Sequence, residues 1–250
     1  MASEKVIETT NLTKHYNHHP AVDRLTFAVE EGEIFGFLGP NGAGKTTTLL
    51  MLLGLTRPTD GAALVCGLEP VRHAREVKHR VGYLPENVGF YADMDAIQSL
   101  EYIADLNGIE KKEAEAKIHD ALKVVGLSED ARKKTAAYSR GMKQRLGIAE
   151  VLIKNPAVMF LDEPTLGLDP DGALRMIELI QSLNEERQMT VLLSSHHLHQ
   201  VQKISHRVGI MIRGKMVAEG SIEALAEDKF GVGDKEYTLE EIYMKYFQEV

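Results

Sequence analysis

Short runs of alternating apolar and polar residues fill the first 33 positions of the chain, for example over residues 6–8 and 25–29. Polar turns separate these runs, a pattern that predicts antiparallel strands, and residues 59–65 continue it. Residues 34–38 are instead wholly apolar, end in a glycine-rich loop and precede a helix-like stretch over residues 46–54. The pattern therefore predicts an antiparallel region followed by a strand, a loop and a helix.

Helical periodicity replaces the strand pattern from residue 95 to residue 154. Two sets of apolar residues share a helical face: Leu100, Ile103, Ala104 and Leu106, then Ile118, Ala121, Leu122 and Val125. Strand-like runs return at residues 157–161 and 190–193, with a helical stretch over residues 173–185 between them. This order predicts an α/β core interrupted by an inserted helical subdomain at about residues 87–154.

The end of the chain carries a Gly-Val-Gly linker at residues 231–233, followed by helical spacing over residues 239–250. A chain of 250 residues buries one sizeable core, so two independent folds are not expected. We assign residues 1–230 to one domain that contains the helical insertion, and residues 231–250 to a short helical tail.

Composition narrows the function classes. The formal net charge is −8, which argues against a general nucleic-acid binder because phosphate neutralisation needs surplus Lys and Arg. The only cysteine, Cys66, excludes an internal disulfide, fits a reducing compartment and is expected to be a small core residue. The first eight residues carry charges where a signal peptide is apolar, and no apolar run approaches the roughly 20 residues that cross a bilayer. Any membrane role is expected to go through a partner.

A phosphate-binding loop is predicted directly after the apolar strand. It matches G-x-x-x-x-G-K-[ST] through Gly39, Pro40, Asn41, Gly42, Ala43, Gly44, Lys45 and Thr46, with Thr47 next in the helix. Glycines let backbone N–H groups approach phosphate oxygens, and the helix N-terminus favours anions. Lys45 supplies a charge for the terminal phosphates of ATP, and Thr46 a hydroxyl for Mg²⁺. The alternative is a glycine-rich turn that only joins strand to helix.

Two carboxylates end the strand-like run at residues 157–161. Asp162 suits the coordination shell of Mg²⁺, and Glu163 is placed to polarise the water that attacks the γ-phosphate. Such residues lie where open α/β sheets bind ligands. The alternative is a pair of solvated charges at the start of a loop.

The stretch Tyr138-Ser139-Arg140-Gly141-Met142-Lys143-Gln144-Arg145 resembles the signature of ABC transporter ATPases. The resemblance covers residues 6–221 and implies that Ser139 and Gly141 complete the nucleotide site of a second subunit. Tyr138, Arg140 and Met142 depart from the commonest signature residues and resemble the branch that serves separate permeases. As an isolated stretch, it is equally a helix start capped by Ser139.

The resemblance also implies roles for isolated residues. Tyr16 falls where an aromatic ring stacks on adenine, although an exposed strand tyrosine is the alternative. Glu86 occupies the place of a glutamine that senses Mg²⁺, with a plain loop carboxylate as the alternative. Asp169 belongs to a loop that crosses the dimer interface, and it is also suited to cap a helix that starts near Pro170.

Residues 192–196 resemble the switch segment of the same family, in which His196 contacts the γ-phosphate and orients Glu163. His196 is preferred over His197 because it follows the serine pair at the strand end. Six histidines form two groups: His15, His18 and His19, then His196, His197 and His199. No cysteine accompanies either group, so we do not expect a soft-metal site.

A narrower resemblance joins residues 83–91 and the tail over residues 239–247 to the ATPase subunit of the copper-processing transporter for nitrous oxide reductase maturation. In that group, the region between Ser221 and Leu239 is longer.

The family implies an α/β P-loop fold of RecA-like type, with ATP and Mg²⁺ as ligands. It also implies a dimer with a second, identical subunit and an integral membrane permease as partner on the inner face of the cell membrane. The permease's coupling segment is expected to dock near residues 86–98. Two alternatives are a soluble ABC ATPase acting on nucleic acid or ribosomes and a regulator that no longer hydrolyses ATP. One cassette without a long insertion disfavours the first, and intact Lys45, Glu163 and His196 disfavour the second.

Overall fold

A computed structural model describes residues 4–17, 19–231 and 237–248 of the chain. Its N-terminal region forms an antiparallel sheet, as the alternating pattern predicts. The long strand β1 (Lys5–Tyr16) lies at the centre and pairs with β2 (His19–Leu25), β3 (Ala28–Glu30) and β5 (Asp60–Val65). His18, one of the histidines grouped above, lies outside the described residues.

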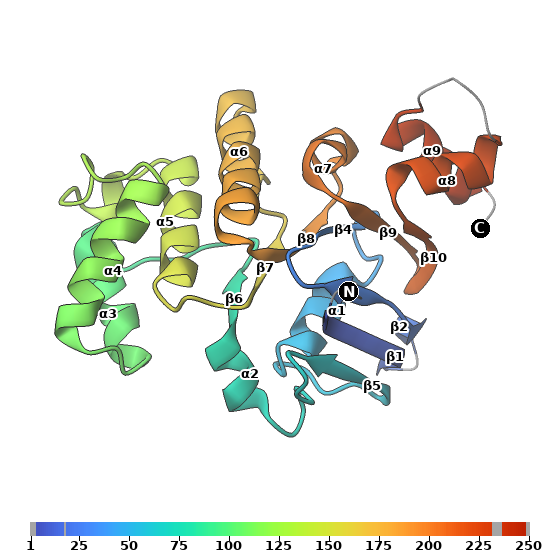
Figure 1. The fold of residues 1–250 in the computed structure, drawn as a ribbon, viewed down its shortest axis with the longest axis horizontal. Helices are drawn as coiled ribbons and strands as arrows, with labels where there is room; N and C mark the ends of the chain where they lie inside the picture. Colours follow the sequence, from blue (N-terminus) through green and yellow to red (C-terminus); the bar gives the residue numbers. More distant parts are fainter. Residues whose placement is uncertain (1–3, 18, 232–236, 249–250) are drawn as a thin grey trace.

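A second sheet of six strands forms the centre of the molecule (Figure 1). Its order is β10 (Lys215–Gly220), β9 (Arg207–Ile212), β4 (Ile34–Leu38), β8 (Thr190–Ser195), β7 (Val158–Asp162) and β6 (Val81–Leu84). Neighbours from β9 to β6 are parallel, and β10 is antiparallel to β9. Every residue of β4, β7 and β8 is buried, because helices or a second sheet cover both faces. This burial explains why these strands are mostly apolar.

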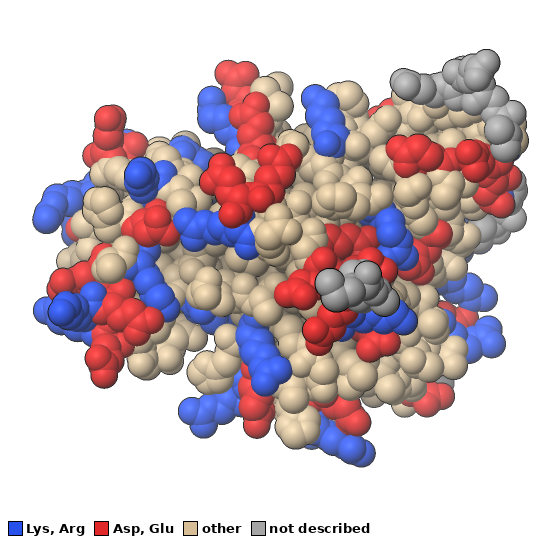
Figure 2. Space-filling model, viewed as in Figure 1, with Lys and Arg blue, Asp and Glu red and all other residues tan. Residues whose placement is uncertain are grey.

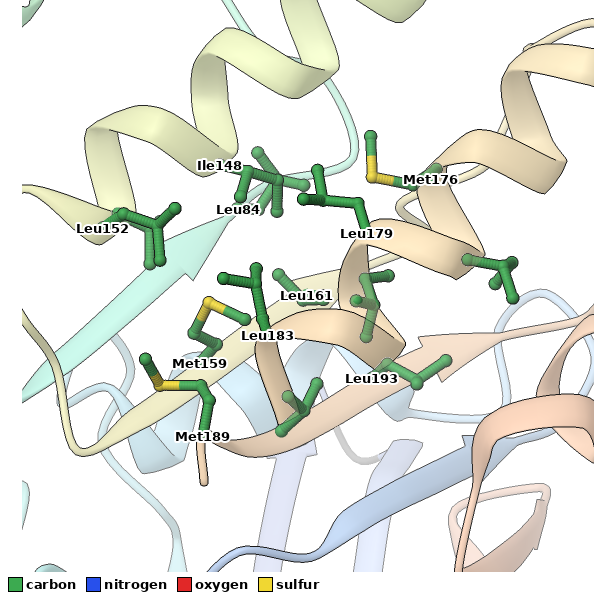
Figure 3. Packing of buried hydrophobic residues seen from close by; sticks show 14 of the residues in the cluster. Leu84, Ile148, Leu152, Met159, Leu161, Met176, Leu179, Leu183, Met189 and Leu193 are labelled. Atoms are coloured by element: carbon green, nitrogen blue, oxygen red, sulfur yellow. The ribbon is translucent and has the colours of Figure 1, made fainter. Parts of the chain in front are cut away.

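Helices cover the parallel sheet on both sides. In Figure 1, α1 (Lys45–Leu52) lies on one side with the antiparallel sheet, and α5 (Arg140–Leu152), α6 (Pro170–Arg187) and α7 (Leu198–Ile204) lie on the other. Figure 3 shows the second interface, where Ile148 and Leu152 of α5 and Leu179 and Leu183 of α6 pack over the strands near Leu161. Burial of these side chains stabilises the layers by about 1.5–3 kcal/mol each.

The inserted helices lie at one end of the sheet. They are α3 (Ala96–Leu106) and α4 (Lys111–Val124), which pack beside α5, with a 3₁₀ turn at Thr135–Ala137 before α5. Asp95 and Gln98 form a capping box at the start of α3. The fold class predicted from the sequence, a parallel α/β core with an N-terminal antiparallel sheet and inserted helices, is confirmed.

Of three further short helices, the sequence pattern predicted only one. These are α2 (Ala74–Arg80), α8 (Ile222–Phe230) and α9 (Leu239–Gln248), of which only the last lies in a segment expected to be helical. Of the expected Gly-Val-Gly linker, only Gly231 lies within the described residues. Helices α8 and α9 pack on each other at the β10 end of the sheet, so the tail belongs to one packed unit that begins before residue 231.

Cys66 differs from its expected place in the core. It is half-buried, in a turn after β5, with a left-handed backbone φ of 50°. Burial raises the pKa of its thiol. Within the described part of the chain, the structure has no helix that is both long and apolar enough to cross a membrane.

Candidate nucleotide site

The candidate site lies where the parallel strands end. β4 leads into the glycine-rich loop, β7 ends at Asp162, and β8 ends at Ser195, so their following residues meet at one edge of the sheet. They border a cleft of about 380 Å³. Its walls are Tyr16, Ala21, Pro40, Asn41, Gly42, Ala43, Gly44, Lys45, Thr46, Thr47, Glu86 and Glu163. Most of the predicted nucleotide residues therefore share one cleft.

Glycine is required at position 44, directly before α1. Its φ is 105°, a left-handed value that disfavours other residues, and an added Cβ would collide with the carbonyl oxygen of Ala21 and lie 2.7 Å from Cε of Met211. As N-cap of α1, Gly44 offers no side chain to the helix N-terminus. The first amide groups of α1 therefore have no side-chain cap and border the cleft, as anion binding requires.

Lys45 is only 6% exposed, and its ammonium is held over the loop. Its Nζ donates to the carbonyl oxygen of Gly39 at 2.7 Å and lies 3.4 Å from Oε1 of Glu163. That carboxylate oxygen is buried and accepts no hydrogen bond within the described residues. A buried cation beside an unsatisfied carboxylate oxygen fits a site that receives a further polar group, such as a terminal phosphate and its attacking water.

Asp162 is fixed by two hydroxyl groups. Oγ1 of Thr46 donates to its Oδ1 at 3.2 Å, and Oγ of Ser194 donates to the same oxygen. Glu86 adds a carboxylate on the wall of the cleft, where Nδ2 of Asn87 approaches its Oε1 at 3.4 Å. Hydroxyl and carboxylate oxygens are hard ligands, so the donor set at Thr46 and Asp162 fits Mg²⁺.

Glu163 is held in a strained conformation beside Asp162. Its backbone φ is 49°, in the left-handed region, which costs of order 1–3 kcal/mol and is typical of functional sites. Its amide donates to Ser194, to both the carbonyl oxygen at 3.1 Å and Oγ at 3.2 Å. Oε2 of Glu163 lies 2.9 Å from Nδ1 of His196. The carboxylate is thus oriented from the backbone, from Lys45 and from the imidazole.

His196, rather than His197, contacts the carboxylate. The ring of His197 lies 4.1 Å from that of His196, and its amide donates to Oγ of Ser195. Burial lowers the pKa of His197, and the neighbouring His196 adds to that effect. The choice between the two histidines made from the sequence agrees with this geometry.

Tyr16 ends β1 at the mouth of the cleft and is 48% exposed. Nζ of Lys14 lies 5.0 Å from the centroid of its ring. It is thus an exposed strand tyrosine that also forms a wall of the cleft, and its stacking on adenine stays a prediction.

Ser139, Gly141 and Asp169 lie elsewhere, in a smaller cleft of about 130 Å³. Ser139 is the N-cap of α5, and its hydroxyl accepts from the amide of Met142 at 3.3 Å. Asp169 is the N-cap residue of α6, but its side chain makes no capping hydrogen bond. The two clefts share no wall residue among the described residues, so one chain does not bring these residues to the phosphate loop.

Three residues of the site were missed from the sequence. Ser194 anchors Asp162, Nε2 of Gln144 reaches the carbonyl oxygen of Pro164 at 3.4 Å, and Oγ1 of Thr165 donates to Gln200 at 2.6 Å. Ser194 stands inside the switch segment, which was a usable signal. The other contacts join segments far apart in the sequence and leave no local pattern.

Figure 2 shows Lys and Arg interspersed with Asp and Glu over the face in view, with no broad basic area on it. That distribution, like the net charge of −8, gives little electrostatic attraction for a nucleic-acid backbone.

Fold and site together define a P-loop nucleoside triphosphatase with a carboxylate poised at the end of a core strand. The family model described as ABC transporter matches residues 22–166. The chain is 45% identical to the bacitracin transport ATP-binding protein BcrA of Bacillus licheniformis over 86% of its own length and 69% of the relative's. It therefore belongs to the ABC transporter family and is an ABC transporter ATPase that binds ATP.

Two further comparisons agree with this. The chain is 40% identical to the Nod factor export ATP-binding protein I of Burkholderia thailandensis, over 90% of its own length and 74% of the relative's. A solved structure described as the ATP-binding subunit of an ABC transporter superposes with a TM-score of 0.85 at 26% identity, covering 97% of this chain and 99% of the other. None of these comparisons supports the copper-processing resemblance, which stays a prediction.

Proposed function

We propose that two copies of this chain hydrolyse ATP between them and thereby drive a separate membrane permease that exports its cargo. The observation that carries the proposal is the buried pair of Lys45 and Glu163 beside the glycine-rich loop, with the half-buried His196 against the carboxylate. The similarity to proteins named for bacitracin transport and Nod factor export favours export as the direction.

In this proposal, each residue near the loop has one task. Lys45 and the amide groups of α1 bind the phosphates of ATP, and Tyr16 stacks on the base. Glu163 polarises the attacking water, and His196 holds its Oε2 in place. Mg²⁺, held by Thr46 and Asp162 with Glu86 nearby, would neutralise charge on the phosphates.

A second copy is proposed because the two clefts lie apart on one chain. Ser139 and Gly141 of one copy would complete the phosphate site of the other, with Asp169 at the contact between copies. The start of α5 suits this task, since the N-terminus of a helix attracts anions. One chain alone offers only half of each site.

The permease is proposed to dock beside α3. Leu106, Tyr91 and Tyr102 are large apolar residues that remain exposed there, Leu106 at 66%, and the two tyrosine rings meet edge to face at 5.8 Å. Next to them, a cleft of about 370 Å³ is lined by Arg75 and Lys78 among other basic residues. This surface extends the region near residues 86–98 that the sequence suggested. Docked in this way to a permease, the chain would act on the inner face of the cell membrane.

The test expresses a tagged copy in the native cells and purifies it from their membranes in mild detergent. An integral membrane protein should co-purify with the wild type, and finding none would overturn the transport function. Leu106→Asp should lower the recovery of that protein at least about fivefold, because a charge replaces an apolar contact at the docking surface. Leu55→Asp, at a leucine of similar exposure after α1, should not, and melting curves of both variants check folding.

A further inference from the structure

The first two turns of α5 lie along the loop that follows β7. Gln144 is 2% exposed and donates to the carbonyl oxygen of Pro164 at 3.4 Å. One turn earlier on α5, Arg140 covers Gly167, since a Cβ added at Gly167 would meet Nη1 of Arg140 and lie 2.6 Å from its Cζ and 3.0 Å from its Nε. The helix therefore touches the loop at two points, which lie four residues apart on the helix and three residues apart on the loop.

That loop is short and begins at the catalytic carboxylate. The amide of Leu166 donates to the carbonyl oxygen of Glu163 at 3.0 Å, and the amide of Leu168 donates to that of Thr165 at 3.2 Å. These two hydrogen bonds restrict the loop between residues 163 and 168, so we expect a displacement of Gly167 to move Glu163 as well. Since Glu163 already has a strained backbone, its position depends on what surrounds it.

Gly167 suits this contact in two ways. Its φ of 69° is left-handed, which glycine adopts without strain, and the missing side chain leaves room for the guanidinium. Arginine suits the opposite side of this contact because its guanidinium is planar and rigid, unlike the ammonium of lysine. Arg140 is also one of the departures from the commonest signature.

We propose that Arg140 is a positioning residue that couples the two nucleotide sites of the dimer by tying the helix that carries Ser139 to the loop that carries Glu163. The inference rests on the two-copy function proposed above. Ser139 serves the nucleotide of the partner, and Glu163 serves the nucleotide of its own chain. The contact of Arg140 with Gly167 joins those two tasks inside one subunit.

The test measures steady-state hydrolysis of ATP as a function of its concentration. Arg140→Ala should lower kcat about tenfold, because a small displacement of Glu163 misplaces the attacking water. Its Hill coefficient should fall from the wild-type value towards 1. Affinity of the isolated subunit for a fluorescent ATP analogue should not change, since Arg140 lies outside the phosphate cleft.

Matched variants separate the contact from the charge. Lys133→Ala removes a cation from an exposed ion pair with Asp130 and should behave as the wild type. Arg140→Lys keeps the charge but loses the planar contact, and it should resemble Arg140→Ala. Gly167→Ala should impair the wild type strongly and the Arg140→Ala background much less, because the guanidinium that it collides with is gone.

Unchanged kcat and Hill coefficient in Arg140→Ala, full rescue by lysine, or additive effects of the two substitutions would each overturn the role of Arg140 while leaving the dimeric ATPase intact. A wild-type protein that hydrolyses ATP without cooperativity would overturn both the coupling role and the two-copy function. Melting curves of every variant identify loss of fold, and Arg140→Lys keeps the test decisive if Arg140→Ala unfolds.

Discussion

Among the described residues, the cleft at the start of α1 and the cleft at the start of α5 are built in opposite ways. At the start of α1, Gly44 caps the helix without a side chain, and the neighbouring Lys45 is buried. At the start of α5, Ser139 caps the helix with its own hydroxyl, and both it and Arg140 are exposed. We call the cleft at α1 the closed cleft, because its charged residues Lys45 and Glu163 are buried, and the cleft at α5 the open surface, because Ser139 and Arg140 are exposed.

This difference indicates that the two clefts have different roles. Lys45 pairs with Glu163, and the hydroxyl groups of Thr46 and Ser194 donate to Asp162, so these side chains are positioned within a single chain. The cleft around Ser139 contains no comparable buried group among its described wall residues. Its side chains gain a partner only when a second surface covers them, in line with the proposed second copy.

The largest expected effect is the loss of ATP hydrolysis when Glu163 of the closed cleft is replaced. Glu163→Gln keeps the shape and removes the charge that polarises water, so kcat should fall about a hundredfold or more. ATP-bound dimers should then accumulate, measured by light scattering after size exclusion, because binding continues while hydrolysis stops. Glu185→Gln, at an exposed glutamate of α6, is the control. Normal turnover in Glu163→Gln would remove the assignment of Glu163.

Glu150 lies near the C-terminal end of α5, outside the walls of the open surface, and its carboxyl is partly buried. Burial raises the pKa of its carboxyl from 4.5 to about 7. The folded state therefore holds the proton more tightly, and the resulting stability is complete below pH 4.5 and is lost as the pH rises through about 7. Glu150→Gln should be more stable than the wild type by about 3 kcal/mol at pH 8 and by almost nothing near pH 4.5.

Urea unfolding at both pH values measures the effect of Glu150→Gln, with Glu115→Gln at an exposed position of α4 as the control. An equal gain at both pH values would mean that the substitution acts through packing and not through the ionisation of the carboxyl.

The sequence predicted the closed cleft better than the open one. Gly44, Lys45, Asp162 and Glu163 lie in short motifs whose spacing reflects local geometry, a strand followed by a turn and a helix. The contact of Arg140 with Gly167 joins residues far apart in the sequence, and no local pattern marks it.

The elements of the fold also differ in how well the sequence predicted them. Long apolar strands were predicted because their periodicity is strong, whereas α2 and α8 were missed because seven and nine residues give a weak helical pattern. A usable signal existed for α8, which starts after the N-cap Ser221 and ends at Gly231 with a left-handed φ.

Adding a methyl group at the phosphate loop should have a moderate effect. Gly44→Ala forces a side chain into a left-handed position and against the carbonyl oxygen of Ala21, so α1 must shift. Nucleotide affinity should fall about tenfold, or 1.4 kcal/mol, in a fluorescence titration. Gly67→Ala carries the same conformational cost, at a φ of 74° with open space around the added Cβ, and should leave affinity unchanged. Equal losses in both variants would show that global destabilisation is the cause.

The smallest effect is expected at the open surface, where Ser139→Ala removes one hydroxyl. The helix cap of α5 is lost, at about 1 kcal/mol of stability. Ser221→Ala removes the same kind of cap from α8, where the hydroxyl accepts from the amide of Ala224 at 3.2 Å, so the two variants should be destabilised alike. Only Ser139→Ala should weaken the ATP-driven dimer, by roughly fivefold in its dissociation constant, because one charge-assisted hydrogen bond to the partner's phosphate is lost. If both variants dimerise equally well, the hydroxyl of Ser139 serves the helix of its own chain and the closed cleft needs nothing from it.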